Sequence, residues 1–225
     1  MKSILTAVLL CTISFSPATG QSLKPISQLY EIAVALSALP SRLRADASVY
    51  ALVDGNYREV RTGSGPFTCI IERNHPEALI PQCMDEAGRE AVLPALIFKS
   101  ERILEGASLE EVEAEFERKA EQCEFLPPAR QGVSYMISDF NYIYIGRTEQ
   151  IMKVRPHVMF YGPNLTNKDI GGSFQAAMEN RGLPFVIGLS IHRNIISHVD
   201  RASDSAEVAA ACNGQLGDPP PLFGL

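Results

Sequence analysis

The sequence predicts an α+β fold, in which a mostly antiparallel sheet carries about three packed helices in a single domain. Three observations predict it. Apolar residues recur every three or four positions in several stretches, which is typical of amphipathic helices. Other stretches alternate apolar with polar residues between turn residues, which is typical of strands. The chain has 225 residues, which suits one domain with terminal segments.

The first 20 residues have the features of a secretory signal peptide. Lys2 precedes the apolar run Ile4 to Leu10, and Ala18 and Gly20 place small residues where signal peptidase recognises them. The run is far shorter than the ~20 residues that cross a bilayer. The sequence therefore predicts a signal peptide over 1–20 and a secreted or periplasmic protein.

The mature chain is acidic. Lys2 is the only charged residue of the leader, so removing residues 1–20 leaves 205 residues with 19 Lys and Arg against 26 Asp and Glu, a net charge of −7. This balance argues against nucleic acid as a partner. No second long apolar segment follows, so we expect no integral membrane segment. We expect a globular domain over 21–200 and a flexible, proline-rich tail over 201–225, with a helix at 206–212.

The first part of the chain predicts one helix and three strands. An apolar stripe that ends at Pro40 predicts a helix over 26–38. Strands at 49–53 and 57–60 flank the turn pair Asp54-Gly55, and Gly63 and Gly65 mark a second turn, where we expect positive φ angles. A third strand follows at 67–71. These features predict an antiparallel meander.

Residues 72–90 are predicted to be a loop. In an oxidising compartment the four mature cysteines, Cys69, Cys83, Cys123 and Cys212, predict disulfides with three possible pairings. A bridge between Cys69 and Cys83 would hold this loop to the sheet, and we favour it. Cys123 and Cys212 are then bonded to each other or free.

Two helices are expected next. Pro94 suits the first position of a helix over 94–105, and Gly106 suits its end. Ser108 and Glu111 form a capping box that opens a third helix. Its apolar stripe includes Cys123, so a buried thiol is an alternative to a bridge. Its acidic face is predicted to be solvated, with a cation or partner surface as the alternative.

The last part of the domain predicts strands at 133–138, 142–145, 158–161, 184–188 and 195–199. A short helix is expected over 165–170.

Several motifs together resemble those of a family of exported bacterial proteins with no assigned activity. The similarity covers about residues 26–199. It implies export and the Cys69–Cys83 pairing, and it implies no mechanism. The motifs are Gly63-Ser64-x-x-Phe67-Thr68-Cys69, Arg73, Cys83-x-Asp85-x-x-Gly88, Tyr135-Met136, Pro156-His157-x-Met159-Phe160-Tyr161-x-Pro163 and Asp169-x-Gly171-Gly172.

Most polar residues that could converge on a ligand lie in residues 132–172. His157, between a proline and a strand, could act as a general base oriented by Asp139 or Asp169. The alternative is a histidine that holds the loop by one hydrogen bond. Nucleophile and nucleotide motifs are absent, so we expect no cofactor.

His192 and His198 are six residues apart, and Asp200 could join them as metal ligands. No established metal motif surrounds them, so no metal is expected.

Tyrosines and one asparagine form the second candidate site. Tyr142 and Tyr144 are predicted to share one face of a strand, and Tyr135 and Tyr161 lie on neighbouring strands. With Asn141 they form a candidate face for binding a small molecule by stacking. The alternative is a half-buried sheet face under a loop.

Three functions follow from these observations. The first is an exported, non-catalytic protein that binds a small molecule or an envelope component; it predicts a polar-lined pocket of ligand size. The second is a secreted hydrolase; it predicts a solvent-open His157 within hydrogen-bond reach of Asp139 or Asp169. The third is a structural envelope protein, which predicts neither feature.

Overall fold

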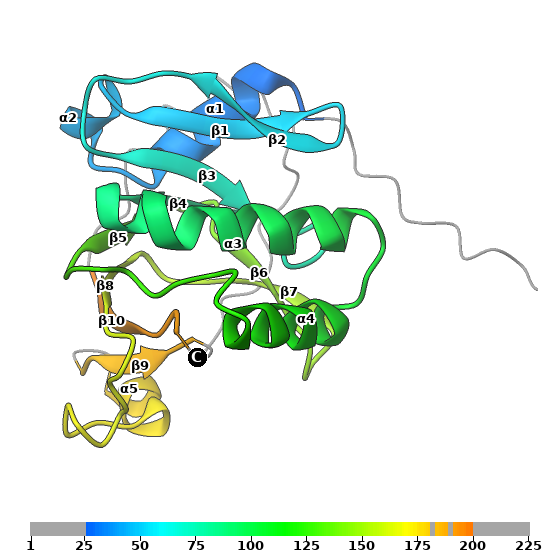
Figure 1. Ribbon diagram of the computed structural model, residues 1–225. Coiled ribbons are helices and arrows are strands. Elements are labelled where there is room, and N and C mark those ends of the chain that lie inside the picture. The colour runs from blue at the N-terminus through cyan, green and yellow to red at the C-terminus, as the bar shows by residue number, and fades with distance from the viewer. Residues whose placement is uncertain (1–25, 181–182, 189–190, 200–225) are drawn as a thin grey trace, which may run out of the picture.

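The computed structural model describes residues 26–180, 183–188 and 191–199. The predicted signal peptide, the predicted tail with its helix, Asp200 and Cys212 lie outside these residues. At the centre is an eight-stranded sheet in the order β2-β1-β3-β4-β5-β8-β10-β9 (Figure 1). Its strands are β1 Ser48–Val53, β2 Asn56–Arg61, β3 Thr68–Glu72, β4 Ile80–Met84, β5 Val133–Met136, β8 His157–Tyr161, β9 Phe185–Ile187 and β10 Asn194–His198.

Helices cover both faces of this sheet. The helix α1 (Gln28–Ser37) packs on β1, β3 and β4 from one side, followed by the short α2 (Ser41–Arg44). The long helix α3 (Glu86–Leu104) packs on β2, β3 and β4 from the other side, with α4 (Leu109–Glu121) beside it (Figure 1). One strand pair is parallel and the others are antiparallel, so the α+β prediction is confirmed.

The β1–β2 hairpin forms as predicted, but the meander does not continue. Asp54 and Gly55 both have positive φ angles, 52° and 84°, as a tight hairpin turn requires. The next strand, β3, pairs with the other edge of β1 and runs parallel to it. Gly63 and Gly65 lie in the connection from β2 to β3, and neither has the positive φ angle that we expected. They are needed there because the backbone of Asp46 leaves no room for a side chain. A Cβ on Gly65 would lie 2.8 Å from the Asp46 carbonyl oxygen.

Residues 72–90 are a loop only over 73–79, so that prediction was wrong for the rest of the range. They contain β4 and the start of α3, which Asp85 caps by accepting a hydrogen bond from the Gly88 amide at 3.1 Å. Pro81 obscured the strand, because proline donates no ladder hydrogen bond. The strand tolerates it because the ladder with β5 covers only Cys83 and Met84, so Pro81 has one paired neighbour, Ile71.

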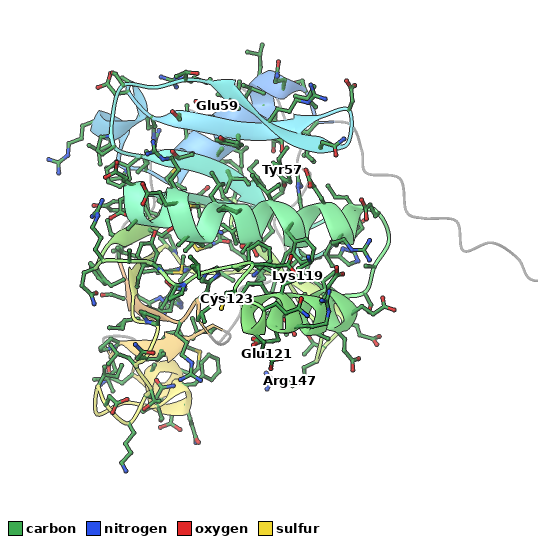
Figure 2. The ribbon with its side chains drawn as sticks, in the orientation of Figure 1. Tyr57, Glu59, Lys119, Glu121, Cys123 and Arg147 are labelled. Atoms are coloured by element: carbon green, nitrogen blue, oxygen red, sulfur yellow. A yellow bond between two sulfur atoms is a disulfide. The ribbon has the colours of Figure 1, made fainter. Side chains whose placement is uncertain are left out.

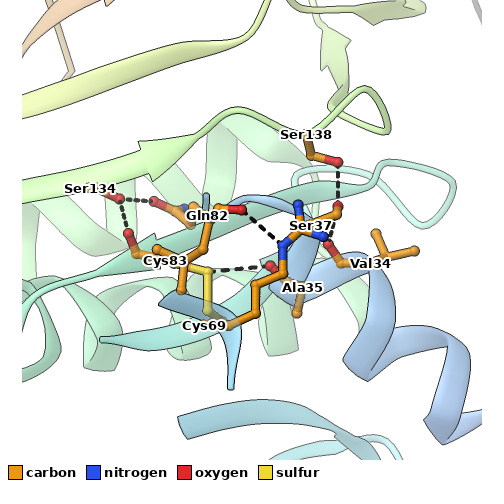
Figure 3. The surroundings of a disulfide bond; sticks show 10 residues. Val34, Ala35, Ser37, Cys69, Gln82, Cys83, Ser134 and Ser138 are labelled. Carbon is orange, nitrogen blue, oxygen red and sulfur yellow. Dashed lines mark hydrogen bonds between the residues drawn. A yellow bond between two sulfur atoms is a disulfide. The ribbon is translucent and has the colours of Figure 1, made fainter. Parts of the chain in front are cut away.

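The Cys69–Cys83 disulfide joins facing residues of β3 and β4, with their Cα atoms 4.0 Å apart. Both cysteines are fully buried under α1, where the Cys83 sulfur lies 3.3 Å from the Ala35 carbonyl oxygen (Figure 3). The bridge therefore fastens two central strands rather than a surface loop.

Helix α3 starts eight residues before the predicted position, so Pro94 lies inside it. Pro94 is exposed, which lets water reach the Glu90 carbonyl that lacks an amide partner. The helix ends before Gly106, at φ 101°, as predicted.

The capping box of Ser108 and Glu111 is confirmed at the start of α4. Cys123 follows the helix at φ 59° and is exposed, which corrects the alternative of a buried thiol (Figure 2).

The C-terminal part of the domain differs from the prediction in two places. Residues 142–145 form a strand, but it belongs to a separate hairpin of β6 (Tyr142–Ile145) and β7 (Gln150–Lys153). No helix forms over 165–170, where the chain makes turns; a helix, α5 (Phe174–Glu179), follows instead. The predicted strands at 158–161, 184–188 and 195–199 correspond to β8, β9 and β10.

Candidate functional site

A cavity of about 430 Å³ lies over the C-terminal half of the sheet, on the side that faces α3. The strands β5, β8 and β10 form most of its floor, and Ile80 and Gln82 of β4 complete it. Helices α3 and α4 form one wall, the β6–β7 hairpin another, and α5 with β9 the third. The volume is that of a site for a small molecule, which is roughly 300–1,000 Å³.

The lining is mostly apolar. Each wall contributes branched, aromatic or methionine side chains, such as Leu96, Phe116, Ile143, Met159, Phe174 and Ile196. Most are buried, whereas Phe174 and Ile187 are 39% and 47% exposed. These two residues belong to α5 and β9. The sequence led us to expect a polar-lined pocket, and the structure differs in this respect.

Asn141 is the most unusual polar group of the lining. It is 0% exposed, at the end of the hairpin, and its backbone oxygen accepts a hydrogen bond from the Val154 amide at 2.8 Å. Among the described residues, neither its side-chain nitrogen nor its side-chain oxygen has a hydrogen-bond partner. Burying an unpaired amide costs free energy, on the order of 1–3 kcal/mol in proteins.

His157 lies on the floor of the same cavity and is 5% exposed. Its Nδ1 is 2.7 Å from the backbone oxygen of Arg155, two residues earlier, and its ring is 6.3 Å from that of His198 on the paired strand β10. Burial, together with a smaller effect of the neighbouring His198, lowers the pKa of His157 to about 4, against the hydrogen bond to Arg155. His157 is therefore uncharged at neutral pH.

A line of charged and polar groups crosses the wall near α3. Glu72 accepts a hydrogen bond from Gln82 at 2.8 Å, and Ser134 lies 3.5 Å from Gln82 (Figure 3). The ammonium of Lys99 is 3.9 Å from Glu72 and lies over the ring of Phe116. Ordered partners thus hold these groups in place.

Glu113 of α4 also lines the cavity, so the acidic face of α4 is not uniformly solvated. Burial raises its pKa, against the attraction of Lys99.

The structure brings three of the predicted site residues to the cavity and places the others elsewhere. His157, Asn141 and Tyr161 line it. Tyr142 packs against the buried residues under α1, and Tyr135 packs edge-on against Phe67 on that side of the sheet.

The remaining candidates have other partners. Tyr144 stacks on His75 at 4.7 Å. The Asp139 carboxylate lies 3.4 Å from Lys153, and the Asp169 carboxylate accepts two hydrogen bonds from Thr166. His157 is 5% exposed and its hydrogen bond goes to Arg155, so it is not the solvent-open histidine that the hydrolase hypothesis predicted. Its catalytic pairing with either acid stays a prediction.

His192 and His198, the two histidines considered as metal ligands, contact different parts of the molecule. His192 points to the backbone oxygen of Leu126 at 3.1 Å, whereas His198 is beside His157 and Phe185. Within residues 26–180, 183–188 and 191–199, no three His, Cys, Asp or Glu side chains gather closely enough to hold a metal ion.

Sequence reasoning missed most of the lining. Strand alternation correctly separated Tyr142 and Tyr144 from Ile143 and Ile145, but the isoleucines face the cavity. The apolar stripe of α4 was expected to lie on one face of the helix, and its residues Leu109, Val112 and Phe116 line the cavity. Alternation shows which residues share a face; it does not show which face encloses a space.

No protein family, curated protein or solved structure matches this chain significantly. The resemblance to exported bacterial proteins therefore stays a prediction. In the described part of the chain, no helix has the length and apolar character needed to span a membrane.

Proposed function

We propose that this protein is an exported, non-catalytic binding protein that encloses a small, mostly apolar molecule in the cavity over β5, β8 and β10. One observation carries the proposal: a ligand-sized apolar cavity has a fully buried amide, Asn141, without a hydrogen-bond partner in the described part of the chain. Binding sites for small molecules combine such apolar walls with a few polar groups that orient the ligand.

The size of the ligand follows from the volume. Each water-sized group occupies about 30 Å³, so 430 Å³ corresponds to about 14 non-hydrogen atoms. Export is supported by the leader, which precedes the described residues, and by the buried Cys69–Cys83 disulfide, because such bridges persist in oxidising compartments.

The first experiment compares the mass of the mature protein from its own host under native and denaturing conditions. We expect a native excess of a few hundred daltons that disappears on denaturation. In parallel, the protein stripped of ligand is titrated calorimetrically with 1-octanol, octanoate and octylammonium. Each has about ten non-hydrogen atoms and so fits within the estimated capacity.

Two adjacent residues of β8 provide a matched pair of variants. Met159→Trp adds bulk on the cavity floor and should abolish binding, whereas Phe160→Trp adds bulk on the opposite face of the same strand and should not. Absence of both a native mass excess and binding of any octyl compound would overturn the proposal. Equal binding by both variants would place the ligand elsewhere and would also overturn it.

A further inference from the structure

The polar groups of the cavity define the kind of head group that a ligand carries, if the proposed function holds. Asn141 presents one acceptor and one donor group, both without partners among the described residues. A ligand that satisfies both must itself donate and accept hydrogen bonds. A carboxylate can only accept, and an ammonium can only donate, so neither charged group can satisfy Asn141 completely.

The tautomer of His157 adds a second constraint. The Arg155 backbone oxygen, 2.7 Å from Nδ1, can only accept, so Nδ1 carries the proton. Because burial keeps the ring neutral, Nε2 is left as an acceptor. An acceptor on the cavity floor requires a ligand group that donates a hydrogen bond, and it repels a carboxylate.

Asn141 and His157 both line the cavity and contact neighbouring residues of one backbone segment. The Asn141 backbone is bonded to Val154, and the His157 ring to Arg155, so one short segment, 154–157, connects the two anchors. Both side chains belong to the lining. A single small polar group at the end of an apolar ligand is therefore the simplest occupant of this region.

The charges of the lining do not favour an anion at the α3 wall. Two cations line this part of the cavity: Lys99, which Glu72 and Glu113 offset, and Arg73, which is paired with Glu31 at 3.6 Å. Arg155, on the segment next to His157, is the residue that would favour an acid, so a carboxylate is the informative competitor.

From these contacts we propose that the cavity binds an uncharged apolar alcohol, whose hydroxyl donates to His157 Nε2 or the Asn141 oxygen and accepts from the Asn141 amide. This inference rests on the proposed function and specifies its ligand class. A hydroxyl matches both anchors because it has one donor and two acceptor lone pairs.

The test uses ligands of equal size and different head groups. Calorimetric titration of the full mature chain at pH 7.5 compares 1-octanol with octanoate, octylammonium and heptyl methyl ether, an isomer of octanol that accepts but cannot donate. We expect octanol to bind about 5- to 30-fold more tightly than the ether, the effect of one hydrogen bond, and more tightly than both ions.

Variants test whether Asn141 and His157 cause the preference for octanol over the ether. The double variant Asn141→Leu/His157→Phe should reduce the preference for octanol over the ether to about twofold or less, because both acceptors for the hydroxyl are lost while the apolar walls remain, and each single variant should reduce it in part. Tyr135→Phe removes a hydroxyl on the opposite face of β5 and should leave the preference unchanged.

The outcomes separate this inference from the proposed function. If octanoate binds more tightly than octanol in the wild-type protein, the head group is acidic, and the alcohol proposal fails while a binding protein stands. If octanol and the ether bind equally, the hydroxyl is not recognised, with the same consequence. If no octyl compound binds, the proposed function itself has failed.

Discussion

The two halves of the sheet carry similar apolar residues, but one half forms a filled core and the other borders a cavity. The N-terminal half, β2-β1-β3-β4, has α1 on one face and α3 on the other, and side chains such as Val49, Ile71 and Met84 are fully buried between them. The C-terminal half, β5-β8-β10-β9, has its α3 side beneath the cavity. The helices there surround the strands rather than cover them. Apolar content alone therefore does not determine whether a face closes into a core.

The polar groups differ in the same way. In the N-terminal half the buried Arg73 has buried partners, with Glu31 at 3.6 Å and the Ala78 backbone oxygen at 2.7 Å. Burial raises the pKa of Glu31, and Arg73 opposes this rise. In the C-terminal half, Asn141 is equally buried without a hydrogen-bond partner in the described residues. Arg73 Nε and Glu31 Oε1 also lack hydrogen-bond partners in the described residues, but the two side chains form an ion pair, whereas neither polar side-chain atom of Asn141 has a hydrogen-bond partner there.

The largest expected effect comes from shortening one isoleucine to alanine in each half of the sheet. Ile71→Ala, in the filled half, should reduce the free energy of unfolding by about 3–4 kcal/mol. Ile196→Ala, on the cavity floor, should cost about half as much, because one side of Ile196 already faces open space and loses fewer contacts. Urea unfolding of both variants measures the difference, and equal losses would contradict a hollow C-terminal half.

A smaller effect concerns pH. The pKa of His157 is about 4 in the folded protein and ~6.5 in the unfolded chain, so the unfolded state binds more protons between these values. Stability should therefore fall as the pH falls from 6.5 to 4, by at most about 3 kcal/mol from this group.

In His157→Gln much of this slope should disappear, although His192, whose pKa burial also lowers, keeps part of it. His75→Gln makes the same substitution at a half-buried histidine outside the cavity and is the matched control. Denaturant midpoints measured across this pH range provide the readout. A slope unchanged in His157→Gln would show that His157 is not buried in the neutral form.

The smallest effect has the opposite sign. Asn141→Leu should raise the free energy of unfolding of the ligand-free protein by about 1–2 kcal/mol, because an unpaired buried amide is replaced by an apolar group of similar size. Asn74→Leu is the matched control: the Asn74 amide both donates to and accepts from the backbone of Tyr144, so its loss should destabilise the protein. Destabilisation by both variants would mean that Asn141 has a structural role.

Local signals predicted much of the fold. The Asp54-Gly55 turn, the capping box at Ser108 and the stop at Gly106 each depend on residues that are close in sequence, and each is confirmed. The failures occurred where tertiary contacts outweigh a local rule. Pro81 fits in β4 because only one neighbouring strand pairs with it at that point. Pro94 fits in α3 because it lies on the exposed side of the helix.

Only part of the candidate site could be predicted from the sequence. Asn141, His157 and Tyr161 attracted notice as polar or aromatic residues in one dense stretch, and they do line the cavity. The apolar lining residues could not be distinguished from core residues, because an empty volume depends on how far apart the walls lie. Leu96 and Phe116 have the same helical periodicity whether they touch the opposite wall or face a ligand.

The strand order also has a consequence for how the chain folds during synthesis. Strands β1 to β4 are consecutive in the sequence and adjacent in the sheet, so contacts among them close short loops at a low entropic cost. A nascent chain that has left the ribosome as far as Met84 already contains these four strands, α1 and both cysteines of the disulfide. These strands can thus pair before any residue of β5, β8 or β10 has been made, and β4 then offers its free edge to β5. The disulfide between β3 and β4 is added where the compartment is oxidising.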